Sequence, residues 1–148
     1  MSGSVSGTVY VGGVVGVQIG GSITGCSSSA TVKGTVDVGG VAGQTNSSAT
    51  LTACYATGNV TSTGSSTGYV HIGGFLGNNY ANVMTACYWK NNHEQGIGYN
   101  KKSTEATKVD GTGVTWKNAV DAMNTALQNA GSKWRYELNG ALPTLRKQ

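Results

Sequence analysis

The chain has 148 residues, enough for one domain with its own hydrophobic core. Its net charge of +4 lies entirely in the C-terminal part, because residues 1–89 contain one Lys and one Asp, whereas residues 90–148 contain nine Lys or Arg and five Asp or Glu. No basic cluster with interleaved aromatic residues occurs, which argues against nucleic-acid binding. No apolar run approaches the roughly 18 to 20 residues of a membrane span.

A hexapeptide with three glycines occurs three times. The copies are VGGVVG at 11–16, VGGVAG at 38–43 and IGGFLG at 72–77. Their spacing is 27 residues from Gly12 to Gly39 and 34 from Gly39 to Gly73, and the longer interval contains TSTGSSTGY at 61–69. An insertion between otherwise matching copies is typical of a loop on a stacked repeat. The repeat therefore predicts a solenoid.

Further positions match when the copies are aligned. The matched sets are Val9, Val36 and Val70; Val11, Val38 and Ile72; Val14, Val41 and Phe75; Ile23, Leu51 and Met84; and Cys26, Cys54 and Cys87. Around the glycines a variable residue alternates with apolar ones, which is the period of a strand with one buried face. We therefore expect residues 1–89 to form a mainly β fold, a parallel β-helix (β-solenoid) of about three coils. The apolar sets become interior ladders, and the glycines allow tight corners through positive φ or close backbone approach.

From Thr115 the apolar period becomes helical. Thr115 suits an N-cap and Gly131 a stop, so we expect a helix over about 115–130, followed by a short hairpin around an Asn-Gly turn. We interpret residues 90–148 as a C-terminal α/β cap made of a polar connection, this helix and the hairpin. The open end of a solenoid exposes strand edges, so the cap is expected to lie over the last coil. The residues expected to make that contact are Trp116, Met123 and Leu127.

The three aligned cysteines allow three interpretations. Zinc sites usually have ligands in close pairs, which this spacing lacks. Adjacent coils lie about 4.8 Å apart, so one disulfide is sterically possible and would leave one thiol over. Free Cys is among the most buried residue types, which favours an inert internal ladder. We predict no metal site and no cofactor.

Catalytic patterns are scarce. The stretch GSSTG at 64–68 fits G-x-S-x-G, and His71 follows it, which allows a hydrolase that uses Ser66 and His71. That motif requires a strand-to-helix turn, whereas this one lies between two predicted strands. The acidic and His residues of 93–110 have no spacing that would bring them together, so we interpret them as a polar connection. We expect no catalytic residues and no enzyme activity.

Residues between the buried positions are expected to face outward. Tyr and Asn on a flat sheet can stack on and hydrogen-bond to sugars or protein surfaces, although exposed Tyr can also be ordinary surface. The candidate binding face comprises Tyr55, Tyr88, Tyr10, His71, Asn79 and Tyr80. Asp37 aligns with Tyr10 and His71, so replacing it with Ala is expected to be mild, whereas Val41→Asp should abolish folding.

The repeated GG-x-x-G, followed by CYATGNVTS or ACYWKNN, resembles the GLUG repeat of bacterial surface and secreted proteins. The C-terminal ATKVDGTGVTWKNAVDAMNTAL is similar to the tail that often follows such repeats. The first copy departs from the pattern, with Ser27 where the others have Tyr55 and Tyr88. The resemblance implies a role in adhesin-like proteins, haemagglutinin-like filaments or non-catalytic regions of secreted peptidases, and it supplies no catalytic residues.

These observations together predict a non-catalytic cell-surface or secreted repeat module for adhesion or for binding and display. The alternative is an accessory region of a secreted peptidase or a glycan-degrading enzyme. Expected partners are host or self surface glycans or proteins, and other domains of a longer parent chain, but not nucleic acid. The numbering begins in mid-repeat, with Val5 aligned to Val32 and Val60, and without a signal-peptide pattern. We expect the mature protein to be extracellular or at the bacterial cell surface.

Overall fold

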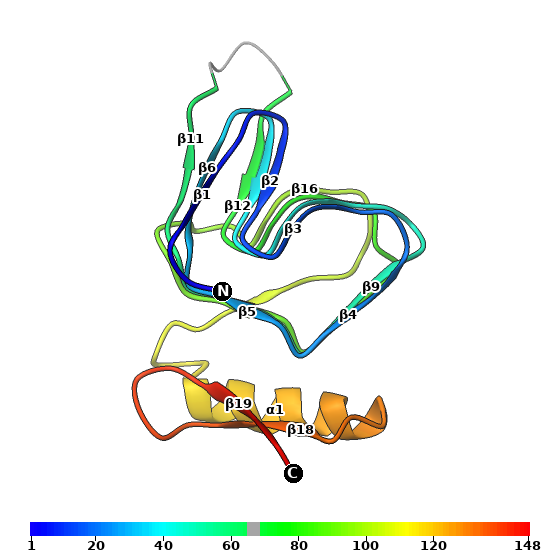
Figure 1. The fold of residues 1–148 in the computed structure, drawn as a ribbon, viewed down its shortest axis with the longest axis vertical. Helices are drawn as coiled ribbons and strands as arrows, with labels where there is room; N and C mark the ends of the chain where they lie inside the picture. The colour runs from blue at the N-terminus through cyan, green and yellow to red at the C-terminus, as the bar shows by residue number, and fades with distance from the viewer. Residues whose placement is uncertain (65–68) are drawn as a thin grey trace.

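The computed structural model describes residues 1–64 and 69–148, and most of these residues form a stack of parallel coils (Figure 1). The first coil contains β1 (Ser4–Ser6), β2 (Tyr10–Gly12), β3 (Val15–Gln18), β4 (Gly21–Thr24) and β5 (Ser27–Ser28). The second contains β6 (Thr31–Gly34), β7 (Asp37–Gly39), β8 (Ala42–Thr45), β9 (Ala49–Thr52) and β10 (Tyr55–Ala56). The third contains β11 (Val60–Ser62), β12 (His71–Gly73), β13 (Leu76–Asn79), β14 (Val83–Thr85) and β15 (Tyr88–Trp89).

The strand register confirms the alignment made from the sequence. Each strand pairs in parallel with its equivalent in the next coil, giving the ladders β1–β6–β11, β2–β7–β12 and β4–β9–β14 together with two longer ones. Val38 pairs with both Val11 and Ile72. Leu51 likewise pairs with both Ile23 and Met84. The predicted mainly β parallel solenoid is therefore confirmed, and the residues that repeat in sequence are those that stack in space.

The solenoid continues beyond residue 89, where the sequence predicted a polar connection belonging to the cap. Strand β16 (Ile97–Asn100) pairs with β13, and β17 (Thr107–Lys108) pairs with β15, so residues 90–108 add a partial fourth coil. Gly98 is the equivalent of Gly77 in the coil before it. A side chain does not fit at Gly98, because an added Cβ would lie 2.4 Å from the Ile72 amide nitrogen. The expected boundary at residue 89 was wrong, since a degenerate copy of the repeat still forms the ladder.

The hexapeptide glycines allow close backbone approach, and none of them has a positive φ. A Cβ on Gly39 would lie 2.2 Å from the carbonyl oxygen of Ala42, and one on Gly43 would lie 2.6 Å from the amide nitrogen of Val11. Both distances are far shorter than a van der Waals contact distance. The chain therefore folds back so tightly after β7 that the backbone of nearby segments occupies the space of a side chain.

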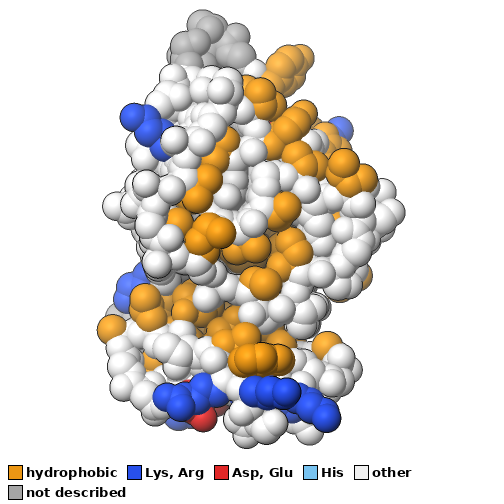
Figure 2. All heavy atoms as spheres, viewed as in Figure 1, with side chains coloured by type: hydrophobic (Ala, Val, Ile, Leu, Met, Phe, Trp, Pro, Cys, Tyr) orange, Lys and Arg blue, Asp and Glu red, His pale blue; other side chains and the backbone are white. Residues whose placement is uncertain are grey.

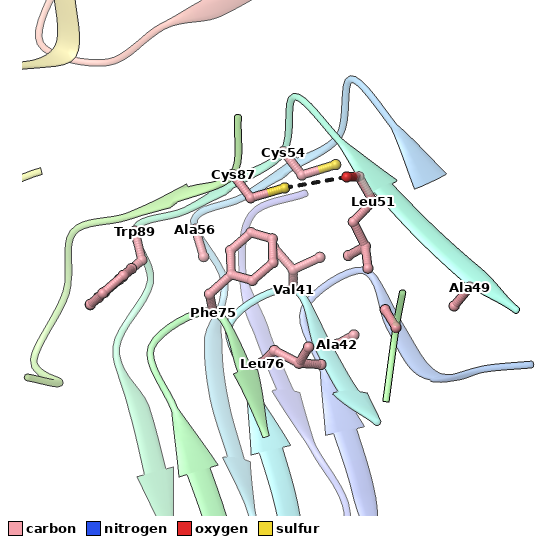
Figure 3. Packing of buried hydrophobic residues seen from close by; sticks show 11 residues of the cluster. Val41, Ala42, Ala49, Leu51, Cys54, Ala56, Phe75, Leu76, Cys87 and Trp89 are labelled. Carbon is pink, nitrogen blue, oxygen red and sulfur yellow. Dashed lines mark hydrogen bonds between the residues drawn. The ribbon is translucent and has the colours of Figure 1, made fainter. Parts of the chain in front are cut away.

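The main core lies inside the coils, between the ladders that contain β8, β9 and β10, and is built from the predicted apolar sets (Figure 3). Val41, Leu51, Phe75 and Leu76 are fully buried. Val9 is exposed, although its set was expected to be internal. It lies before β2 rather than within it, so the alternation of a strand does not determine where its side chain points.

The cysteines form a stack of three free thiols, as the internal-ladder interpretation predicted. Cys54 and Cys87 are buried and Cys26 is partly buried. The Cys87 thiol donates to the carbonyl oxygen of Leu51 over 3.7 Å (Figure 3). A hydrogen bond with Cys54, together with burial, raises the pKa of the Cys26 thiol. Among the residues that the structure describes, no group of three or more His, Cys, Asp and Glu residues is placed to hold a metal ion.

The C-terminal elements form where the sequence predicted them. Helix α1 (Trp116–Asn129) begins after Thr115, whose side chain accepts a hydrogen bond from the Asn118 amide in a capping box. Gly131 follows the helix with a φ of 71°. Strands β18 (Trp134–Glu137) and β19 (Thr144–Lys147) pair antiparallel. Within residues 1–64 and 69–148, no helix is long and apolar enough to cross a membrane.

The cap covers one side of the coil stack instead of its end. In Figure 1, where the coils overlie one another, α1 and the hairpin lie beside them. The Tyr55 ring of the second coil is 5.1 Å from the Trp116 ring, and Leu127 lies next to Gly25 of the first coil. The expected position over the last coil was wrong, because the helix packs on the lateral ladder that carries Tyr55 and Tyr88. Figure 2 shows Lys and Arg side chains in a row over this cap.

Replacing Phe75 with Ala should lower the free energy of unfolding by about 3 to 5 kcal/mol, because it leaves a cavity in the core. Val83→Ala on the exposed side of β14 is the control and should cost less than about 0.5 kcal/mol. Urea denaturation followed by circular dichroism measures both. Equal losses would show that the inside of the coil has been assigned wrongly.

The thiol ladder predicts a clear titration result. Denatured protein should react with 5,5′-dithiobis(2-nitrobenzoate) at all three cysteines, whereas folded protein should react slowly and first at Cys26, which is the least buried. Raised pKa values for Cys26 and Cys54 leave little thiolate near neutral pH, which slows the reaction further. A single reactive thiol after denaturation would instead indicate a disulfide between two coils.

Candidate binding surface

The structure places the six predicted binding residues in three different environments. One group lies beneath the cap, one lies inside the solenoid, and one lies on the free surface. The buried pair is Tyr55 and Tyr88, and the interior residue is Asn79. At the surface, Tyr10 is exposed, whereas His71 and Tyr80 are partly buried.

Tyr55 and Tyr88 point away from the coil, as predicted, but they are covered and cannot form a free binding face. They are 5% and 9% exposed because α1 and β18 pack on them. The Tyr55 hydroxyl donates to the carbonyl oxygen of Pro143, and its ring makes an edge contact with Tyr136 at 5.7 Å. Burial raises the pKa of both phenols. These tyrosines attach the cap to the solenoid, so assigning them to a binding surface was wrong.

Asn79 is fully buried inside the solenoid, contrary to its predicted outward position. Its side-chain oxygen accepts from the Thr45 hydroxyl at 2.9 Å, and its nitrogen donates to Asn100 and Thr104 at 2.9 Å each. Thr45 is its equivalent in the preceding coil and Asn100 its equivalent in the next. The side chains of successive coils satisfy one another, which allows a polar residue to occupy an interior column.

His71 and Asp37 form a partly buried pair between two ladders. His71 Nδ1 lies 2.7 Å from one carboxylate oxygen of Asp37, and Asn78 Nδ2 donates to the other at 3.2 Å. Asp37 is only 3% exposed, so the expectation that it faces solvent was wrong. The cause is the fold-back at the glycines: a Cβ on Gly77 would meet the backbone of Val38 and Asp37, so β13 lies directly against β7.

Tyr99 extends this cluster to the surface. Its ring stacks on His71 with centroids 4.9 Å apart and an angle of 30° between the planes, and Lys101 Nζ lies 5.7 Å from the Tyr99 centroid. The phenol is 39% exposed. Sequence reasoning missed Tyr99 because it lies in the segment interpreted as a polar connection. The available signal was IGYN at 97–100, which aligns with LGNN at 76–79.

One column of side chains joins these residues into a continuous feature. On the ladder β3–β8–β13–β16, the register pairs one residue from each coil with its equivalent in the next. We call this column the outer strip; its members are Val17, Gln44, Asn78 and Tyr99. Tyr10, which pairs with Asp37 on the facing ladder, is also exposed. Tyr99 is exposed and Val17 and Gln44 are partly exposed, whereas Asn78 is only 6% exposed and its amide nitrogen is bonded to Asp37.

This arrangement is suited to binding through stacking and hydrogen bonds. An acid–His pair is also part of hydrolytic triads, in which His activates a hydroxyl nucleophile. The predicted nucleophile Ser66 lies outside the described residues, so a hydrolase based on Ser66 and His71 stays a prediction. Here both carboxylate oxygens of Asp37 are engaged by His71 and Asn78, and His71 carries the stacked Tyr99 ring. The Asp37–His71 pair therefore orients the Tyr99 ring of the outer strip.

Replacing Asp37 with Ala should destabilise the fold by about 1 to 3 kcal/mol, because it leaves two polar partners unsatisfied. Lys33→Ala is the control, since Lys33 is the other charged residue of the first 89 and is exposed. Denaturant melts of Asp37→Ala, His71→Ala and the double variant form a cycle in which the combined loss should be smaller than the sum. Strict additivity would mean that the pair contributes no coupling.

Residues 4–33 match the family model described as the GLUG motif, a segment that runs from β1 through most of β6 and so comprises one turn of the solenoid. No curated protein and no solved structure matches the chain. The resemblance read from the glycine hexapeptides is thus confirmed for this segment. The chain carries a GLUG motif, and that motif forms the first coil of a parallel β-solenoid.

Proposed function

We propose that this chain is a non-catalytic repeat module of a cell-surface or secreted protein, and that it acts in adhesion by binding or displaying a surface ligand. The outer strip is the observation that carries this proposal. Its side chains come from successive coils of one ladder, so their spacing is fixed by backbone hydrogen bonds rather than by flexible loops. A binding face that is rigid before contact loses little conformational entropy when a ligand arrives.

The distribution of charge supports binding over acid–base chemistry. Lys33 and Asp37 are the only charged residues in the first 89 positions, and Asp37 is already paired. A surface with so few ionisable groups is poor in general acids and bases. Half of the ten Lys and Arg residues lie on the cap, on the side of the solenoid that carries Tyr55 and Tyr88. We assign the cap the role of covering that side, which leaves the outer strip as the face for partners such as host or self glycans and proteins.

Adhesion should depend on Tyr99. Beads coated with the purified protein should bind saturably to at least one member of a panel of surface glycans and extracellular-matrix proteins, and Tyr99→Ala should abolish most of that signal. Trp134→Ala is the matched control, because Trp134 is an exposed aromatic residue on the cap. Silence across the panel would reject adhesion as the function. A signal lost equally in both variants would place binding somewhere other than on the strip.

A further inference from the structure

A shallow hollow of about 400 Å³ spans the first three coils and includes Val17 and Gln44 of the outer strip. Val17 and Ile19 contribute apolar groups to its lining, and Ile19 is 80% exposed. The phenol of Tyr80 and the amides of Gln44 and Asn46 also line it. Tyr80 was predicted from the sequence as a binding residue, and the structure places it in the lining of this hollow. A large exposed aliphatic side chain next to a phenol and two amides is a surface suited to a ligand with both apolar and polar faces.

Tyr99 provides a second platform on the same ladder, in the partial fourth coil. One face of its ring is held by His71, which is itself fixed by Asp37. A ring held in this way is oriented before any ligand binds, which reduces the entropy lost on contact. Its equivalents in the second and third coils are Gln44, which lines the hollow, and the buried Asn78. At about 4.8 Å per coil, the distance from Val17 to Tyr99 along the stack is about 14 Å.

The charge and hydrogen-bonding character of this surface select the ligand. Amide side chains both donate and accept hydrogen bonds, as do hydroxyl groups, so Gln44 and Asn46 match a ligand rich in hydroxyls. Exposed tyrosine rings match the apolar C–H faces of sugar rings. Asp37 is paired and buried, and Lys101, next to Tyr99, brings a positive charge to one end only. Such a surface favours an uncharged polyhydroxylated chain over an anionic polymer, which requires rows of Lys or Arg.

We propose that the hollow and the outer strip form one track for a neutral oligosaccharide that lies along the solenoid axis. This inference rests on the proposed function and names the ligand class of that same surface. One sugar ring occupies the hollow against Ile19 and Tyr80, a second stacks on Tyr99, and the amides of Gln44 and Asn46 bind hydroxyls of the ring in the hollow. A peptide ligand is the competing outcome of the test.

Isothermal titration calorimetry of the purified chain with cello-, chito- and malto-oligosaccharides of increasing length tests the track. Affinity for at least one series should rise with length until the chain spans both platforms and then level off. Tyr99→Ala and Tyr80→Ala should each weaken binding by about tenfold or more, as for a buried aromatic contact. Tyr99→Phe should retain most of the affinity, because it keeps the stacking face, and Trp134→Ala should have no effect. Circular dichroism melts establish that each variant is folded.

The outcomes separate this inference from the proposed function. No binding to any of the three series, while coated beads still adhere to a matrix protein through Tyr99, would overturn the oligosaccharide and leave the adhesion proposal standing. Binding that does not depend on length, or that survives in folded Tyr99→Ala and Tyr80→Ala, would overturn the track. Loss of bead adhesion to every surface would reject the proposed function itself.

Discussion

The structure depends on the close approach of backbone to backbone at the glycine hexapeptide. At Gly39 and Gly43 the space that a Cβ would occupy is filled by main-chain atoms of Ala42 and Val11. This contact allows the ladder β3–β8–β13–β16 to fold directly against β2–β7–β12, and both the core around Phe75 and the outer strip follow from that fold-back. Glycine has a larger entropic cost of folding than other residues, about 0.5 to 1 kcal/mol relative to Ala, and the stacked core offsets this cost.

The same fold-back explains a buried charge in a region that has almost none. Asp37 lies on the outer side of its strand, yet β13 packs so closely that His71 and Asn78 engage both of its carboxylate oxygens. A buried carboxylate without such partners would cost far more free energy than the coil could compensate. Once paired, it orients His71 and through it Tyr99. The close backbone packing at the glycines therefore also determines the orientation of the Tyr99 ring at the surface.

The cap uses the opposite side of the solenoid, and it illustrates how a repeat accommodates a segment that does not repeat. Tyr55 and Tyr88 form an apolar column on the outside of the coil, and α1 buries it with Trp116, Met123 and Leu127. The first coil has Ser27 at that position, and there the hairpin and Leu127 of the helix lie near Gly25. Outward direction and exposure are thus separate properties, because an outward residue stays exposed only where no other segment packs on it.

The sequence by itself determined the parallel solenoid, the register of its ladders and the limits of the helix. Equivalent residues of successive coils stack on each other, so residues that recur in the sequence, such as Val11, Val38 and Ile72, are also the residues that pair. The helix is delimited by local signals, namely the caps at Thr115 and Gly131. Only the tertiary structure decided which outward residues stay free. The burial of Tyr55, Tyr88 and Asp37 and the exposure of Tyr99 depend on segments distant in sequence that pack together, and a periodic pattern holds no information about what covers its outer face.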